Sequence, residues 1–192
     1  MTHRRHVILG LAGAALGTPS LAQAAFKPLF DGKSLDGWAR LGDANWTVEA
    51  GVLSADKGAL SYLVSKDSYR DFDLRAEIWV SPEANSGIFI RCSDPAQVSS
   101  SHAYEVNVFD TRPDPTYGTG AIVGVAKVSP MPKAGDRWNL MEITARGDTF
   151  SVRFNGQLTV DAARDATYAQ GPVALQYGAG VVKFRKVEIR TI

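Results

Sequence analysis

The chain has 192 residues, 45% hydrophobic and 21% charged, which is the composition of an ordinary globular domain. The 21 Lys and Arg residues against 20 Asp and Glu leave a formal net charge of +1, so the charge balance does not favour nucleic acid or an anionic membrane as a partner. The single cysteine, Cys92, cannot form an internal disulfide, so the fold has to be held by packing.

The N-terminus has the form of an export signal. The basic stretch His3 to His6, which includes paired arginines, precedes a short apolar run from Val7 to Gly17, and Ala22-Gln23-Ala24 has the A-x-A form of a signal-peptidase site. The apolar run is shorter than the roughly 20 residues that span a bilayer. We therefore expect residues 1–24 to be a signal peptide, possessing features suited to twin-arginine export, with an uncleaved membrane anchor as the alternative. Residues 25–192 are expected to form a single domain that is periplasmic or secreted.

Beyond the signal, short runs rich in Val, Ile, Phe and Tyr recur between turn residues, with almost no helical periodicity. The expected strands are Trp46 to Glu49, Val52 to Ala55, Phe72 to Val80, the run containing Ile88 and Ile90, Tyr104 to Phe109, Leu140 to Ala145, Thr149 to Phe154, Gln157 to Val160, Val173 to Tyr177 and Val181 to Ile189. Ala50-Gly51 and Asn155-Gly156 are typical of tight hairpins. This pattern predicts an all-β sandwich or barrel. The stretch from Thr111 to Thr119 is expected to be a binding rim or a disordered excursion.

Alternation along three of these strands separates a core face from a second face. The residues left opposite the core are Glu77, Trp79, Phe89, Arg91, Glu105 and Asn107. If the three strands are antiparallel neighbours, these side chains project from one surface and can meet around one small ligand. Carboxylates beside an arginine and flat aromatic rings supply what a sugar site needs: hydroxyl acceptors, a fixed cation and a stacking surface. A purely solvated face is the alternative interpretation.

Several chemistries are disfavoured by the residues present. His102 is the only histidine after residue 25, so a cluster of His and Cys ligands for zinc cannot form. A Ca²⁺ or Mg²⁺ ion bound by carboxylates remains open, although no Asp-rich calcium loop is present. The chain contains no G-x-S-x-G nucleophile elbow and no phosphate-binding glycine loop.

A succession of short motifs carries a family resemblance across nearly the whole chain after residue 25. The motifs are Leu29 to Trp38, Trp46 with Gly51, Asp71 to Leu74 with Glu77, Asn85 to Arg91, Tyr104 to Asn107 with Asp110, Thr119 to Ile122, Trp138-Asn139, Asn155-Gly156, Leu175-Gln176 and Phe184-Arg185. In this order they resemble the 3-keto-disaccharide hydrolase domain family. The resemblance implies a concanavalin-A-like jelly-roll sandwich of two antiparallel sheets with its site on the concave face. It also implies action on 3-keto glycosides made by a separate oxidase.

Two positions depart from the family pattern, and either departure is expected to alter substrate choice or activity. Asn107 stands where the family usually has glutamine, and Val123 where it often has tyrosine.

The resemblance also suggests roles for the residues on the second face. A 3-keto group acidifies the C2 hydrogen, so a base can remove that proton and the C1 substituent can leave by elimination, with a positive group stabilising the enolate oxygen. The expected roles are Glu105 as the base, Arg91 as the enolate stabiliser, Glu77 as acid or orienting partner, Asn107, Trp79 and Tyr117 as sugar-binding residues, and Asp110 as the reserve base. No cofactor is expected. The alternative function is a carbohydrate-binding module without catalysis.

Overall fold

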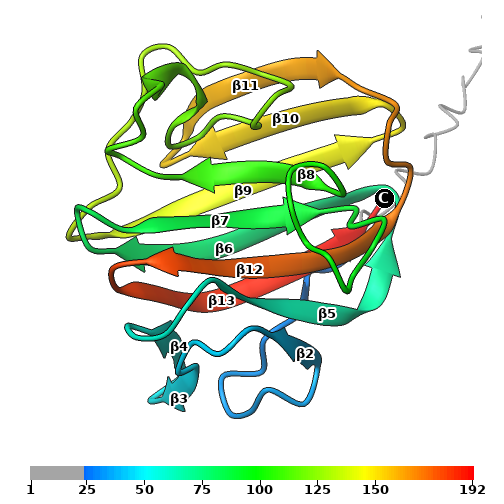
Figure 1. The fold of residues 1–192 in the computed structure, drawn as a ribbon. Coiled ribbons are helices and arrows are strands. Elements are labelled where there is room, and N and C mark those ends of the chain that lie inside the picture. Colours follow the sequence, from blue (N-terminus) through cyan, green and yellow to red (C-terminus); the bar gives the residue numbers. More distant parts are fainter. Residues whose placement is uncertain (1–23) are drawn as a thin grey trace, which may run out of the picture.

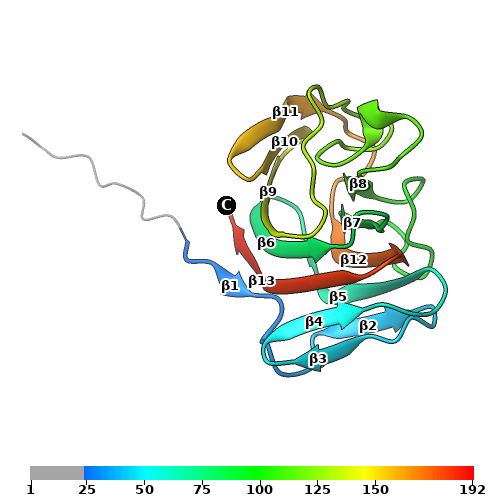
Figure 2. The same ribbon diagram turned by 90° about the vertical axis from the view of Figure 1, so that its left-hand side faces the viewer.

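The structure is a computed structural model that describes residues 24–192. Two antiparallel sheets pack face to face, and Figure 2 shows them as two layers. The expected signal peptide lies outside the described residues except for Ala24. Within the described residues, no helix is long and apolar enough to cross a membrane.

The larger sheet has eight strands and the smaller sheet has five (Figure 1). The eight-stranded sheet contains β1 (Lys27–Pro28), β3 (Thr47–Glu49), β4 (Val52–Ala55), β6 (Phe72–Val80), β9 (Trp138–Arg146), β10 (Thr149–Phe154), β11 (Gln157–Arg164) and β13 (Val182–Thr191). Its order is β11-β10-β9-β6-β13-β4-β3, with β1 paired to β13. The five-stranded sheet has the order β2-β5-β12-β7-β8, formed by β2 (Trp38–Leu41), β5 (Ser61–Tyr69), β12 (Gly171–Ala179), β7 (Asn85–Ile90) and β8 (Tyr104–Val108). A short 3₁₀ helix, η1 (Pro115–Tyr117), follows β8.

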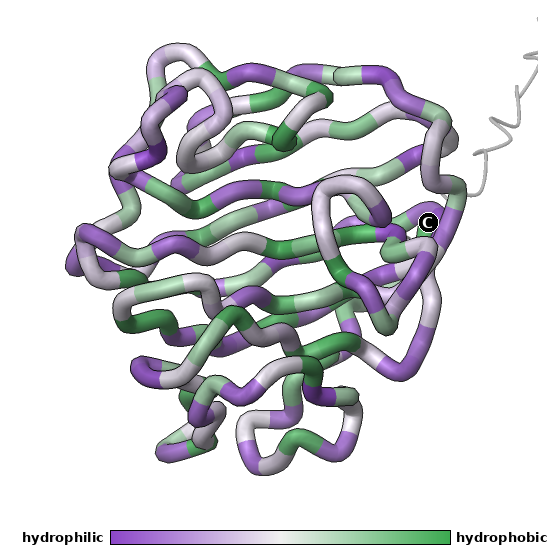
Figure 3. The backbone as a smooth tube through the Cα atoms, in the orientation of Figure 1, coloured by the Kyte–Doolittle hydropathy of each residue, from purple (hydrophilic) through white to green (hydrophobic). Residues whose placement is uncertain are grey.

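The core lies between the two sheets and is built by alternating residues. Leu74 and Ile78 of β6 face Ile88 of β7 and Val106 of β8, and each of these side chains is at most 1% exposed. Figure 3 shows the resulting alternation of hydrophobic and hydrophilic residues along the strands. Because side chains in a strand alternate between faces, each strand of the smaller sheet also presents residues on the side away from this core.

The predicted strands and hairpins are confirmed, and the fold is the expected concanavalin-A-like sandwich. Ala50 and Gly51 have φ of 49° and 80°, and Asn155 and Gly156 have φ of 51° and 79°, as two-residue hairpin turns require. The sequence interpretation omitted β1, β2 and β5. In β5 the residues from Ser61 to Ser65 are all buried, so this strand does not show the alternation that reveals a strand with one wet face.

The expectation that three consecutive strands form one surface is wrong for β6. That strand lies between β9 and β13 in the eight-stranded sheet, whereas β7 and β8 are neighbours in the five-stranded sheet. Alternation identifies the residues on one side of a strand, but it does not reveal which sheet the strand joins. In this sandwich the chain crosses from one sheet to the other between β6 and β7.

The segment that follows β8 folds back along that strand. The amide of Val123 donates to the Glu105 carbonyl, and the amide of Asn107 donates to the Ala121 carbonyl, both at 3.0 Å. The segment from Thr111 to Thr119, expected as a rim or a disordered excursion, contains η1 and contacts β8 through the Tyr117 carbonyl. The edge of β8 is therefore covered by backbone pairing.

Candidate functional site

The outer face of the five-stranded sheet carries two rows of side chains that the strand register defines. The first, the polar row, crosses the strands in the order Tyr62, Gln176, Gly87 and Asn107. The second, the apolar row, consists of Val64, Ala174, Phe89 and Glu105 in the same strand order. Figure 1 shows the four strands β5, β12, β7 and β8 side by side. Residues that are far apart in the sequence, such as Tyr62 and Gln176, are thereby gathered on one surface.

The segment between β7 and β8 covers most of the apolar row. Val98 and Ala103 of this segment join Val64, Phe89 and Ala174 in a small buried cluster separate from the main core. In Figure 1 this segment crosses in front of the strands near the label of β8. The apolar row is therefore dry, and Glu105 at its end is placed beside hydrophobic side chains.

Glu105 is the most unusual ionisable group on this face. The residue is 8% exposed, and no hydrogen-bond donor within residues 24–192 reaches its carboxylate. Burial raises the pKa of Glu105, and the positive charge of Arg112 opposes this rise in part. A carboxyl group of this kind binds a proton more readily than an ordinary glutamate, which suits a general base.

Two amides in the polar row each have an unpaired oxygen. Asn107 is fully buried, and its Nδ2 donates to the Tyr117 carbonyl at 2.7 Å while its Oδ1 has no partner. Gln176 is 5% exposed, and its Nε2 lies 3.5 Å from the Tyr62 hydroxyl while its Oε1 has no partner. The polar row therefore presents two buried acceptors that have no donor among residues 24–192.

Tyr62 belongs to the polar row and lies close enough to Glu105 for the charge of that residue to act on it. Its ring packs edge-on against Phe89 with centroids 5.3 Å apart. Burial raises the pKa of the Tyr62 hydroxyl, the hydrogen bond from Gln176 lowers it, and the nearby negative charge of Glu105 raises it further. Tyr62 therefore keeps its proton and can donate it in a hydrogen bond.

Of the expected site residues, the structure brings together Glu105, Asn107 and the backbone carbonyl of Tyr117. Tyr117 contributes its carbonyl to Asn107, and the Lys127 ammonium lies 5.6 Å from the centroid of its ring. Asp110 follows β8, but its carboxylate accepts hydrogen bonds from the Thr119 hydroxyl and the amides of Ala134 and Gly135. Asp110 therefore fastens a loop.

The structure places Arg91 in the interior, away from this face. Its backbone φ of 54° ends the extended conformation of β7, and the side chain is only 1% exposed. The guanidinium donates to the carbonyls of Arg70, Gly147 and Tyr168 and pairs with Asp71 at 3.2 Å. The expected position of Arg91 beside Glu105 is wrong, because alternation holds only while the backbone stays extended.

Glu77 and Trp79 lie on the outer face of the eight-stranded sheet, across the sandwich from Glu105. Burial opposes the ionisation of Glu77, but hydrogen bonds from Lys186 and Arg185 outweigh it and hold the pKa of Glu77 below its usual value. The Lys183 ammonium lies 4.6 Å from the centroid of the Trp79 ring. The expected shared surface therefore excludes both residues.

The interpretation of the sequence omitted Tyr62, Gly87, Gln176 and Arg112 as site residues. Tyr62 lies on β5, and the sequence pattern does not predict this strand. Gln176 is part of the Leu175-Gln176 motif, and it alternates with the core residues Leu175 and Tyr177 of β12. Alternation in β12 could have placed Gln176 opposite the core, although the pairing of β12 with β7 could not be read from the sequence.

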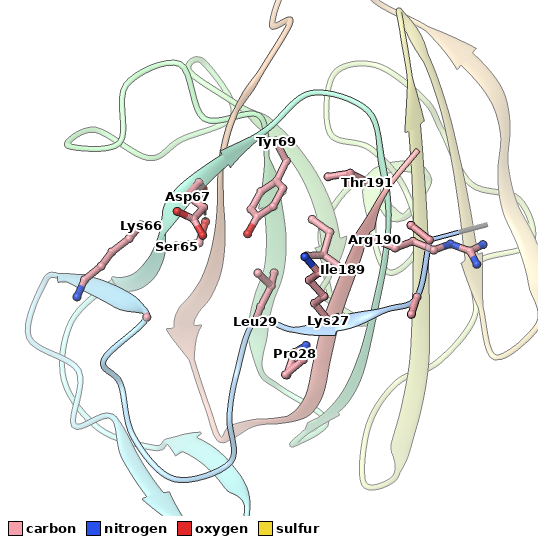
Figure 4. A pocket seen from close by; sticks show the side chains of 13 residues that line it. Lys27, Pro28, Leu29, Ser65, Lys66, Asp67, Tyr69, Ile189, Arg190 and Thr191 are labelled. Carbon is pink, nitrogen blue, oxygen red and sulfur yellow. Dashed lines mark hydrogen bonds between the residues drawn. The ribbon is translucent and has the colours of Figure 1, made fainter. Parts of the chain in front are cut away.

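A cavity of about 460 Å³ lies elsewhere, at the edge of the sandwich between β1, β5 and β13. Figure 4 shows Leu29, Tyr69 and Ile189 in this cavity, with Lys66 and Asp67 from β5. Its lining shares no residue with the polar row or the apolar row. Within residues 24–192, no group of three or more His, Cys, Asp or Glu side chains is arranged to hold a metal ion.

Comparison with known proteins identifies the family. Residues 25–190 match the family described as the 3-keto-alpha-glucoside-1,2-lyase-like domain, so the chain belongs to this family. Comparison of the sequence with curated proteins gives no match.

Solved structures share the fold at low sequence identity. Two proteins from Parabacteroides distasonis, designated as presumed glycosyl hydrolases, have TM-scores of 0.73 and 0.74 with 23% and 16% identity. The matches cover 88% and 87% of this chain, and 100% and 94% of those chains. The carbohydrate-binding module CBM66 from Bacillus subtilis has a TM-score of 0.61 with 17% identity over 81% of this chain and 96% of its own. At these identities the similarity establishes the jelly-roll fold alone.

Proposed function

We propose that this protein cleaves 3-keto glycosides by elimination, with Glu105 as the base. The observation that carries the proposal is the Glu105 carboxyl, which is buried, has a raised pKa and has no hydrogen-bond donor within the described residues. The proposal is supported by membership of the lyase-like domain family. A base in this position suits the 3-keto glycoside chemistry that the family description indicates.

The number of carboxylates on the face favours elimination over ordinary glycoside hydrolysis. Glycosidases commonly use two carboxyl groups that flank the anomeric carbon, about 5–9.5 Å apart. The five strands of the smaller sheet contain two carboxylates, Asp67 and Glu105, and Asp67 lines the cavity at the edge of the sandwich. One carboxylate on a sheet face is sufficient for a substrate whose C2 proton is already acidic.

In the proposed reaction, Glu105 takes the proton from C2, and the electron pair of the C2–H bond forms an enolate with the C3 carbonyl. The enolate then collapses to a C1–C2 double bond as the C1–O bond breaks, and the leaving oxygen takes up a proton. Addition of water across this double bond gives the hydrolysed keto sugar. If water does not add, the unsaturated sugar is the product.

Two groups take the place that the sequence interpretation gave to Arg91. Arg112 is the cation whose charge acts on Glu105, and the Tyr62 hydroxyl keeps a proton available for the developing enolate oxygen. A donor preorganised at such an oxygen contributes about 10²–10³ to the rate. Replacement of Tyr62 by Phe or Arg112 by Met is expected to lower turnover of a 3-keto glucoside without unfolding the protein. Turnover that is unchanged in both variants would exclude these roles.

The proposed setting is the space outside the inner membrane, reached through the N-terminal signal. A separate oxidation must first convert the C3 hydroxyl of a glycoside into a ketone, so the proposed partner reaction is that of a glycoside 3-oxidase. The reaction as written requires no cofactor.

The second candidate function is sugar binding without turnover. The two unpaired amide acceptors in the polar row suit a sugar whether or not chemistry follows, and the fold is shared with a carbohydrate-binding module. Affinity for glycosides, unchanged by Glu105→Gln and without any aglycone release, would establish this alternative.

The test mixes purified protein with a nitrophenyl 3-keto-glucoside and, separately, with the unoxidised glucoside, and follows release of the nitrophenol. The proposal predicts release from the keto form alone. A 3-keto substrate carrying deuterium at C2 should react more slowly, because the C2–H bond is broken. Equal release from both glucosides would show ordinary hydrolysis and contradict the proposal.

A further inference from the structure

The two unpaired oxygens of the polar row flank the one position in that row that has no side chain. Gln176 lies on one side of Gly87 in the register and Asn107 on the other. Neighbouring strands are about 4.8 Å apart, so the backbones of Gln176 and Asn107 are separated by about 9.6 Å with Gly87 between them. No side chain therefore separates the Gln176 and Asn107 side chains in this row.

An amide oxygen only accepts hydrogen bonds, and in the structure each of the two amide nitrogens is turned toward a partner. A carbonyl can only accept, so the Tyr117 carbonyl requires the nitrogen of Asn107 on its side and directs the Asn107 oxygen away from it. The amide nitrogen of Gln176 is directed to the Tyr62 hydroxyl, which leaves the Gln176 oxygen free. A buried acceptor without a donor costs about 1–3 kcal/mol, and folded proteins contain few of them. Two buried amide oxygens of this kind lie in one row, on either side of a glycine, and this points to a ligand that carries hydrogen-bond donors.

The surroundings of Gly87 are tight. A methyl group built there would lie 3.5 Å from Gln176 Oε1, 3.0 Å from the Val106 carbonyl oxygen and 3.7 Å from the Asn107 Cα. Any larger residue would press on the Val106 carbonyl, so only glycine fits next to the Gln176 oxygen without a shift of the backbone.

We propose that Gly87, Gln176 and Asn107 form a subsite for a pair of hydroxyl groups on the sugar ring. One hydroxyl donates to Gln176 Oε1 and the other to Asn107 Oδ1. The oxygens are buried in the free protein, and the Gln176 side chain, with three rotatable bonds, turns its amide toward the ligand as the sugar enters. This proposal rests on the proposed function for the position of the reacting carbon.

The position of Glu105 indicates which hydroxyls are bound. Glu105 is two residues from Asn107 on β8 and on the same face, about 7 Å along the strand. With C2 of the sugar at Glu105 and the ring directed along β8 toward Asn107, the proposed subsite binds the hydroxyls on C4 and C6. The subsite therefore selects a substrate that carries both hydroxyls, in the configuration that places them side by side.

A single trapped water that donates to both oxygens is the competing explanation. A double-mutant cycle, in which one change is made in the protein and the other in the ligand, distinguishes the sugar subsite from a trapped water. The protein carries Glu105→Gln so that a bound 3-keto sugar persists, with and without Gln176→Met, which replaces the amide by an apolar side chain of similar shape. The probes are methyl 3-keto-glucoside and its 4-deoxy and 6-deoxy analogues, with affinity measured by calorimetry.

If the subsite binds hydroxyls, removing one of the two hydroxyls weakens binding about tenfold when Gln176 is present and has little effect in Gln176→Met. Gly87→Ala should weaken binding of the full sugar about tenfold while the thermal melt shows a folded protein. Equal losses with and without the amide, or no sugar binding at all, would overturn the subsite.

Turnover by the protein with Glu105 intact is measured separately. If the affinity lost with a hydroxyl depends on Gln176 but no turnover is found, the subsite is supported and the lyase activity is contradicted. If turnover is found but the affinity loss is the same with and without the Gln176 amide, the lyase activity is supported and the subsite is contradicted.

Discussion

Glu105 and Glu77 are carboxylates in strands of the same sandwich, and their surroundings shift their pKa values in opposite directions. Burial raises the pKa of Glu105, whereas hydrogen bonds from Lys186 and Arg185 outweigh burial at Glu77 and lower its pKa. A raised pKa favours proton uptake and a lowered one favours a permanent anion in an ion pair. This contrast separates the candidate base from a structural carboxylate.

The raised pKa of Glu105 predicts how stability changes with pH. The folded protein holds the Glu105 proton above the unfolded pKa of about 4.3, so the stability contribution of this group falls as the pH rises from there through the raised folded pKa. Glu105→Gln should therefore melt at a higher temperature than the unchanged protein at pH 7, and this difference should vanish near pH 4. Thermal melts at both pH values measure it.

The matched control is Glu77→Gln, because the pKa of Glu77 is shifted in the opposite direction to that of Glu105. The lowered pKa of Glu77 means that its stabilising contribution is present above the unfolded pKa and is lost as the pH falls, so its replacement should not raise the melting temperature at pH 7. A Glu105→Gln variant less stable than the unchanged protein at pH 7 would contradict the assigned environment.

Arg91 should matter for folding and not for chemistry. Its replacement by Ala leaves three backbone carbonyls and Asp71 without their donor in the interior, and breaking such a buried arrangement costs about 3–5 kcal/mol. Arg185→Ala removes a partly exposed ion pair with Glu77 and should cost less than about 1 kcal/mol. Urea unfolding of both variants gives the comparison. An Arg91→Ala protein as stable as Arg185→Ala would contradict this role.

The sequence predicts the direction of a single side chain where the backbone is extended. Glu105 and Asn107 were predicted on one face because Tyr104, Val106 and Val108 alternate with them, and all three face the core. Arg91 could not be placed, since one left-handed residue at the end of β7 redirects its side chain and nothing in its composition announces that turn.

Among the elements, the loop after β8 decides what surrounds the candidate site. Asp110 holds the start of this loop to its end, through the Thr119 hydroxyl and the amides of Ala134 and Gly135. The same loop provides Arg112 and Tyr117. Its attachment to β8 thus positions the charge that acts on Glu105.

Asp110→Asn should loosen this loop without unfolding the sandwich. The carboxylate accepts hydrogen bonds on both oxygens, and the substitution turns one of these oxygens into an NH₂ group, so at least one of the hydrogen bonds from Thr119, Ala134 and Gly135 is lost. We expect amide hydrogen exchange in residues 111–135 to accelerate by about tenfold or more, equivalent to one lost hydrogen bond. Asp114→Asn is the control, because Asp114 only caps η1. Exchange that is unchanged throughout the loop in Asp110→Asn would contradict the fastening role.

The sequence pattern does not predict β5, and the burial of this strand explains why. A central strand that is buried on both faces reads as a continuous apolar run, and such a run lacks the period of two. Hairpins with Ala50-Gly51 and Asn155-Gly156 were recognisable because their turns require positive φ at both positions.

For the whole molecule, the two outer faces of the sandwich differ in chemistry. On the eight-stranded sheet three ion pairs join β6 and β13: Glu77 with Arg185, Arg75 with Glu188 and Asp73 with Arg190. On the five-stranded sheet, Glu105 and two amide oxygens have no partners within the described residues. The buried polar groups without partners favour the outer face of the five-stranded sheet as the ligand-binding surface.

The assignment of strands to sheets could not be predicted from the sequence. Phe72 to Val80 and the strand containing Ile88 and Ile90 follow one another in the chain with similar patterns, yet they belong to different sheets. Periodicity is a local property, whereas sheet membership depends on partners far away in the chain, such as β12 for β7 and β13 for β6.

Comparison of Glu105→Gln with Glu77→Gln in the release of aglycone from a 3-keto glucoside tests the central claim most directly. The two substitutions make the same chemical change on opposite faces of the sandwich. The account predicts that Glu105→Gln abolishes release, with at least a hundredfold loss as expected for a missing general base, and that Glu77→Gln releases aglycone at close to the unchanged rate. Release that survives Glu105→Gln, or that is lost in a folded Glu77→Gln protein, would place the chemistry on the other face and contradict the account.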